Sequence, residues 1–180
     1  MTRRSRMALA TAAVAAACAA LAAGIAAAAG GAGSTAAAAH ATARFHDLST
    51  AERAGYGLLK DKQGIACIAM DSMPDMGAMG VHYAKSSLVA DGKLDVARPE
   101  ALVYAPQGTT LRLAAVEYVV LESAWNARHA GPPALFGHRF NLTPAGNRFG
   151  LPAYYSLHAW LWKHNPAGTF SMWNPEVHCR

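Results

Sequence analysis

The chain has 180 residues, of which 53% are hydrophobic and 15% are charged, and its formal net charge at pH 7 is +5. Three of the 16 basic residues and none of the 11 acidic residues lie before residue 40, so residues 40–180 hold 13 basic against 11 acidic residues, a net charge of +2. This weak charge argues against nucleic acid as a partner, because nucleic-acid binding requires a strongly basic surface.

The first 39 residues have the pattern of an export signal. Arg3, Arg4 and Arg6 precede an alanine-rich apolar run, and small residues follow it. Cleavage of such a signal is expected between about residues 28 and 39. A membrane anchor is the alternative, and an incomplete lipobox ending at Cys18 offers a lipid anchor. We therefore expect a secreted or cell-envelope protein that meets a membrane only through the signal or a lipid at Cys18.

Residues 40–180 have the length of a single domain, which we expect to begin with a helix. Residues 40–60 predict this helix, with Ser49 and Glu52 as a capping box and Gly55 as a weak point in its middle. The apolar residues 65–69 predict a short strand.

A hairpin is predicted in the middle of the chain. After a strand at 80–84 and a loop at 86–100, residues 101–105 and 111–121 are rich in apolar and β-branched residues, as is typical of strands. The turn between them predicts an antiparallel hairpin with a loop of about four or five residues.

The last third of the chain combines a loop-rich stretch with a clear strand. Glycine and proline punctuate residues 122–150, which predict irregular structure with one short strand near 135–140. Residues 153–162 alternate, which places Leu157, Ala159 and Leu161 on one face and His158, Trp160 and Trp162 on the other. The expected fold class is α+β, with an N-terminal helix packed on an antiparallel sheet or a small open β-barrel.

Two cysteines, Cys67 and Cys179, follow the predicted signal. An even pair in an exported domain predicts a disulfide. Closing a loop of about 110 residues stabilises the fold by roughly 4–5 kcal/mol in the chain-entropy model. The alternative, two thiolate ligands of one metal ion, fits no common zinc spacing.

Five segments together carry a family resemblance: MGVHY, KLDVARPEALVYAP, LRLAAVEYVV, LFGHRF and LHAWLWKHNPAGTFSMWNP. In order and spacing they resemble an uncharacterised family of small exported actinobacterial proteins, over residues 43–179. The resemblance implies one exported domain with a cysteine pair near residues 67 and 179, and it implies no activity. Its first segment includes Met79 and His82 but not Met70 or Met73.

A methionine run precedes His82 at a regular spacing of three residues: Met70, Met73, Met76 and Met79. Thioethers are soft ligands that prefer Cu(I), so the run predicts a copper-handling loop. Pro74 and Gly77 prevent a helix that would align the sulfur atoms, and methionine also fills gaps in ordinary cores. The alternative is a mobile loop with half-buried methionine side chains.

Glu117 is an acid within an apolar strand, and a buried carboxylate requires a partner. Together with His82 and His158 on neighbouring strands it would form a site for Zn(II), Fe(II) or Mn(II), similar to that of a cupin-like barrel but without the His-x-His pair. The alternatives are a structural network in which Glu117 pairs with a histidine, Arg112 or Arg139, and a Glu117 that faces solvent.

These residues predict a binding protein for an unidentified small ligand or metal ion, with a polar pocket around His82, Glu117 and His158. The alternatives are a Cu(I)-handling protein that uses the methionine run and a non-catalytic structural protein of the cell envelope. No Gly-x-Ser-x-Gly or phosphate-binding glycine loop occurs. Whether the protein is an enzyme stays open.

Overall fold

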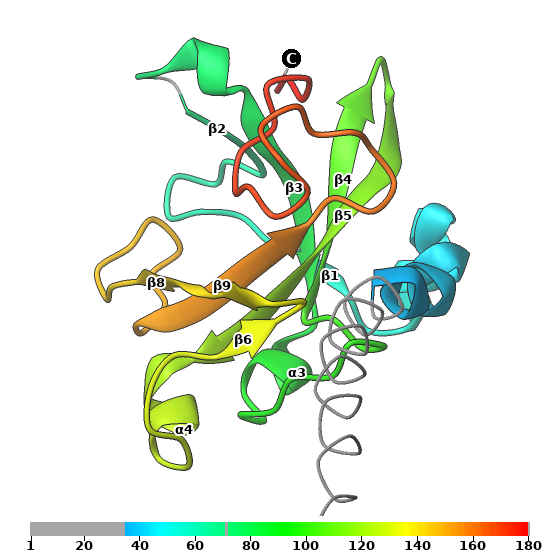
Figure 1. Ribbon diagram of the computed structural model, residues 1–180. Helices are drawn as coiled ribbons and strands as arrows, with labels where there is room; N and C mark the ends of the chain where they lie inside the picture. The colour runs from blue at the N-terminus through cyan, green and yellow to red at the C-terminus, as the bar shows by residue number, and fades with distance from the viewer. Residues whose placement is uncertain (1–34, 71, 180) are drawn as a thin grey trace, which may run out of the picture.

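The computed structural model describes residues 35–70 and 72–179 (Figure 1). Most of the predicted export signal and Cys18 lie outside the described residues, whereas residues 35–39 are helical. No helix within the described ranges has the length and apolar character needed to cross a membrane. The structure combines helices with an antiparallel sheet, which confirms the α+β class.

The N-terminal region is a series of short helical turns rather than one helix over 40–60. The helix at residues 35–42 leads into η1 (Ala43–His46), and α2 (Leu48–Arg53) follows. The predicted capping box at Ser49 is wrong, because Asp47 caps α2 and its carboxylate accepts hydrogen bonds from Ser49 N and Thr50 Oγ1. Gly55, with a φ of 90°, lies just past the helix end.

Seven strands form one antiparallel sheet in the order β1-β3-β4-β5-β9-β8, with β2 also pairing with β3. Their bounds are β1 (Gly57–Leu58), β2 (Cys67–Ala69), β3 (Ala78–Ala84), β4 (Ala101–Gln107), β5 (Thr110–Leu121), β8 (Asn141–Thr143) and β9 (Tyr154–Ala159). The predicted hairpin is β4–β5, but only two residues separate these strands instead of the expected four or five.

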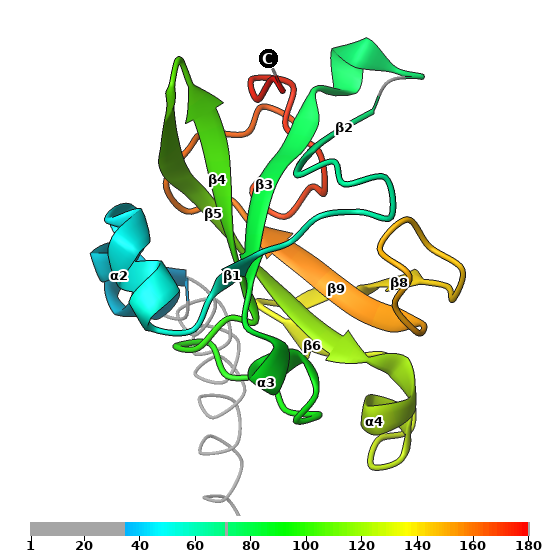
Figure 2. The ribbon, with the colours of Figure 1, turned by 180° about the vertical axis from the view of Figure 1, so that it is seen from behind.

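Short elements occupy the connections. They are η2 (Pro74–Met76), α3 (Ser86–Val89), α4 (Glu122–Asn126) and the hairpin of β6 (Ala134–Leu135) with β7 (His138–Arg139). The single strand expected near 135–140 is therefore wrong, because the chain reverses there at Phe136, which has a φ of 54°, and Gly137. In both views α3 and α4 lie at the same end of the sheet, opposite the tip of the β4–β5 hairpin (Figures 1 and 2).

One face of the sheet packs against the N-terminal helices, which lie along its side in Figure 2. Phe45, Ala51 and Tyr56 from that region join a core cluster with strand residues that include Leu102, Tyr104, Val116, Tyr118 and Leu157. The opposite face has its own small cluster, built around Val103, Ala115, Trp160 and Val177. This second face carries the candidate site.

The alternation predicted for residues 157–162 is confirmed through Leu161 and is wrong at Trp162. Leu157 and Ala159 lie in the first core cluster, whereas Trp160 lies in the second. The strand ends at Ala159, so no strand pairing enforces the two-residue period beyond it. Trp162 consequently packs against the first cluster, on the side away from His158.

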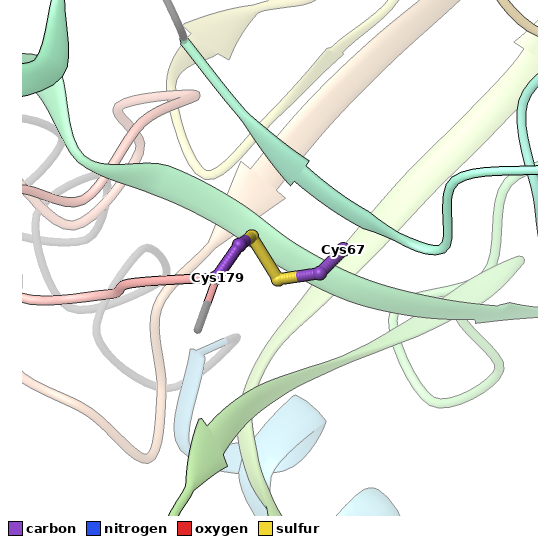
Figure 3. Close-up of a disulfide and its surroundings, with 2 residues drawn as sticks. All are labelled: Cys67 and Cys179. Atoms are coloured by element: carbon purple, nitrogen blue, oxygen red, sulfur yellow. A yellow bond between two sulfur atoms is a disulfide. The ribbon is translucent and has the colours of Figure 1, made fainter.

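The predicted disulfide joins Cys67 on β2 to Cys179 near the C-terminus, with Cα atoms 5.6 Å apart (Figure 3). The alternative of two thiolate metal ligands is wrong, because both sulfur atoms are consumed in this bond. The C-terminal segment also pairs with the sheet through Ala78 and Asn174, which exchange two backbone hydrogen bonds. The disulfide thus links the C-terminal tail covalently to β2, beside β3.

Candidate metal centre and its cavity

Three residues predicted as metal ligands meet on one face of the sheet. His82 lies on β3, Glu117 on β5 and His158 on β9. The two Nε2 atoms of His82 and His158 are 3.2 Å apart. Glu117 Oε2 lies 3.5 Å from His82 Nε2, and Glu117 Oε1 lies 3.4 Å from His158 Nδ1. One ligand atom from each residue lies within 4.8 Å of the others.

Strand register explains why these side chains converge. Glu117 pairs directly with His158, so both side chains point to the same face. His82 pairs with Val103 on β4, the strand that separates β3 from β5, and Ala101 on that strand pairs with Glu117. Since Ala101 and Val103 are small, they leave room for the imidazole of His82 to reach across β4 toward Glu117.

The site is nearly sealed from water. His82 and His158 are each 2% exposed and Glu117 is 9% exposed, so the predicted alternative of a solvent-facing Glu117 is wrong. Burial lowers the pKa of His82 to about 4 and that of His158 to about 3, which leaves both rings neutral at pH 7. Burial also raises the pKa of Glu117, while His82 and a hydrogen bond with Ser156 oppose that shift.

Among the described residues, the basic side chains within 4 Å of the Glu117 carboxylate are the two neutral histidines, whereas Arg112 and Arg139 are exposed. The Nε2 atoms of His82 and His158 lie within hydrogen-bond distance of each other, so one ring can donate to the other. In the described part of the chain, His82 Nδ1 makes no hydrogen bond of good geometry, and its nearest acceptor is the Gly80 carbonyl, which favours the protonated ring and raises the pKa of His82. The three residues alone therefore leave one buried ring nitrogen unsatisfied.

The same geometry suits a divalent ion. Two imidazole nitrogens bound to one zinc ion at about 2.0–2.1 Å, in tetrahedral geometry, lie roughly 3.3 Å apart. The observed separation of the two Nε2 atoms is 3.2 Å. Neutral imidazoles and a carboxylate are ligands that Zn(II), Fe(II) and Mn(II) accept.

A cavity of about 550 Å³ opens above this group. His82, Glu117 and Ser156 contribute to its lining, whereas His158 lies outside the lining. The remaining wall is mainly apolar and includes Val89, Val119, Leu121, Phe149, Leu151 and Trp173. An apolar cavity with a few convergent polar groups is the usual form of a small-ligand site.

A bulge in β3 directs Met79 into this cavity. Ile68 pairs with Gly80 and Ala69 with Ala78, so Met79 is the extra residue of β3. Gly80 has a φ of 96°, and a Cβ atom there would lie 2.6 Å from the Tyr104 carbonyl oxygen. The bulge lets Met79 and His82, which would face opposite sides of a regular strand, both line the cavity.

The other methionines of the run lie in different surroundings. Met73 and Met76 are 49% and 40% exposed at η2, and Met70 is half-buried before it, whereas Met79 is 7% exposed. The run therefore divides between an exposed turn and the cavity wall. Copper binding by this run stays a prediction.

Other polar groups on the cavity wall are held by the protein itself. The Asn147 side chain donates to the carbonyls of Pro144 and Leu151 and accepts from the N–H groups of Phe149 and Leu151. Arg148 donates to Asp61. Sequence reasoning missed the Asp61–Arg148 pair, which no spacing could reveal across 87 residues, but Ser156 could have been found, since it precedes His158 by two residues on one strand face.

No family model, curated protein or solved structure matches this chain. The resemblance to the actinobacterial family therefore stays a prediction. The functional conclusion depends on the geometry of the site.

Proposed function

We propose that this protein is an exported binding protein that holds a divalent metal ion, Zn(II), Fe(II) or Mn(II), through His82, Glu117 and His158. The observation that carries the proposal is the convergence of one ligand atom from each of these residues within 4.8 Å, beside a cavity that His82 and Glu117 line. The disulfide supports the exported location, because such bonds persist in oxidising compartments.

A structural network is the competing role for the same residues. Replacing a buried charged network by apolar residues is often neutral or stabilising, so a network that served folding alone would have little advantage over an apolar one. The site also faces a cavity instead of solid packing, and the two Nε2 atoms beside that cavity have the separation that two ligands of one ion require. These features favour an ion as the missing component.

The direct test is elemental mass spectrometry on protein purified from its export compartment without chelators, followed by metal titration of chelator-treated protein. We expect about one zinc, iron or manganese ion per chain. His158→Gln should abolish binding, whereas His164→Gln should leave it unchanged, because the His164 side chain is 77% exposed and outside the site.

Two other results would redirect the assignment. Copper at one ion per chain that disappears in Met73→Leu and Met76→Leu variants would move the function to the methionine run. A protein that is isolated without metal and takes up none of the four ions would leave the structural role.

A further inference from the structure

The polar and apolar residues that line the cavity lie in different parts of it. His82, Glu117 and Ser156 lie together at its floor, whereas Val119, Leu121 and Trp173 belong to an apolar wall. The wall's amide and guanidinium groups, described above for residues 147 and 148, already bond to the protein. A ligand therefore has polar partners around Glu117 and mainly apolar contacts elsewhere.

The charge of the loaded site points to the kind of polar group. A divalent ion with two neutral imidazoles and one carboxylate carries a net charge of +1. The ligand residues are at most 9% exposed, so this charge would lie in an environment of low polarity. An uncompensated charge there is costly, and one further anionic oxygen donor would neutralise it.

From these two features we infer that the cavity binds an amphiphile, a molecule with an apolar chain or ring body and one anionic oxygen head group such as a carboxylate. The head group coordinates the metal ion, and the apolar body fills the cavity toward Val119 and Leu121. This inference rests on the proposed function. The volume of about 550 Å³ lies within the range of roughly 300–1,000 Å³ that is common for small-molecule sites.

Isothermal titration calorimetry with simple probes tests the head group and the body separately. Zinc-loaded protein would be titrated with octanoate, 1-octanol and acetate, and metal-free protein with octanoate. We expect octanoate to bind the zinc-loaded protein at least tenfold more tightly than either other probe, and at least tenfold more tightly than it binds the metal-free protein.

Variants that fill the cavity with a larger side chain test whether octanoate binds inside it. Val119→Phe should weaken octanoate binding at least tenfold while zinc binding is retained, and Ala84→Phe, at another position of the lining, provides a second variant if the first does not fold. Leu142→Phe is the matched control, because Leu142 is 50% exposed on β8 and outside the cavity.

Each failure has a distinct meaning. Zinc binding without octanoate binding overturns the inference and leaves the proposed function intact. Equal octanoate affinity with and without zinc also overturns it, because the head group would not be on the ion. Failure to bind any of the divalent metals, measured before any amphiphile is added, overturns both.

Discussion

Asp61 and Arg148 tie together two loops that lie 87 residues apart in sequence. Asp61 Oδ2 accepts hydrogen bonds from Arg148 Nη2 at 2.8 Å and Nε at 3.3 Å, and the backbone N–H of Lys62 donates to the Arg148 carbonyl. Asp61 Oδ1 also accepts from the N–H groups of Gln63 and Ile65. The loop after β1 thereby fixes the loop before β9, which supplies one wall of the cavity.

Asp61→Asn should loosen that wall. The hydrogen bonds from Arg148 lower the pKa of Asp61 below its usual value of 3.8. A lowered pKa means that the stabilisation is complete above 3.8 and is lost as the pH falls through the folded-state value. The variant should therefore melt at a lower temperature than the native protein at pH 7, and the difference should shrink below pH 3.8.

Hydrogen exchange measures how the same variant changes the local stability of the loop before β9. Amides of residues 145–151 should exchange faster in Asp61→Asn, because the ion pair holds that loop. Asp95→Asn is the control, since Asp95 and Arg98 form an exposed pair, and it should change neither property. Unchanged exchange in the loop would show that the pair does not brace the cavity.

Glu117→Gln should separate metal binding from folding. Glutamine keeps the shape of the side chain and removes a charge whose burial is unfavourable. We expect the free energy of unfolding of the metal-free variant to be unchanged or about 1 kcal/mol higher, and the increase in melting temperature caused by zinc to be lost. Chemical denaturation with and without zinc measures both, and a large loss of stability without metal would support the structural role.

Gly80→Ala should disturb the bulge that orients Met79 and His82. The φ of 96° is unfavourable for alanine, and the added Cβ atom would lie 2.6 Å from the Tyr104 carbonyl oxygen. We expect a loss of at least about 2 kcal/mol in the free energy of unfolding. Gly57→Ala is the matched control, because Gly57 has no atom within 4 Å of its added Cβ and should tolerate the change.

The double variant Cys67→Ser and Cys179→Ser should be less stable by about 2–5 kcal/mol, because the bond closes a loop between residues 112 positions apart. Urea denaturation of the variant and of the oxidised native protein measures this difference. Metal binding should persist at temperatures where the variant is folded, since neither cysteine belongs to the site. If the variant is as stable as the native protein, the other contacts of the C-terminal tail are sufficient to hold it on the sheet.

Glu100→Gln should remove a pH dependence of stability. Burial raises the pKa of Glu100 from 4.5 to about 8, with smaller contributions from Asp91 and Glu117, while the N–H of Val119 opposes the shift. The native protein should lose stability as the pH rises from 4.5 to 8, by up to about 1.4 kcal/mol per pH unit, because the folded state retains a proton that the unfolded state releases.

The glutamine variant lacks this titration, so it should be nearly as stable as the native protein at pH 5 and more stable at pH 8. Denaturation curves at both pH values provide the comparison. Glu52→Gln, at an exposed position on α2, should show no such difference. A native protein whose stability does not change over this range would contradict the assignment of a buried, protonated Glu100.

Strands could be predicted wherever neighbouring residues in the sequence show a regular apolar pattern. The β4–β5 hairpin and the alternation of β9 followed from runs of apolar residues with a two-residue period. The cap of α2 was misplaced because Asp47, Ser49 and Thr50 are all good capping residues, and only the backbone conformation selects Asp47. The reversal at Phe136 depends on a positive φ at a residue type that rarely adopts it.

The candidate ligands were identified in sequence because Glu117 is an acid within an apolar strand and histidines occur on two other predicted strands. Strand periodicity and the residue types of the site can thus be read directly from the order of amino acids. Three features become visible only in the folded chain: His82 reaches across β4, Met79 lines the cavity, and Asp61 accepts hydrogen bonds from Arg148. These are contacts between distant segments, set by strand register, a bulge and loop closure, and no periodicity within one segment encodes them.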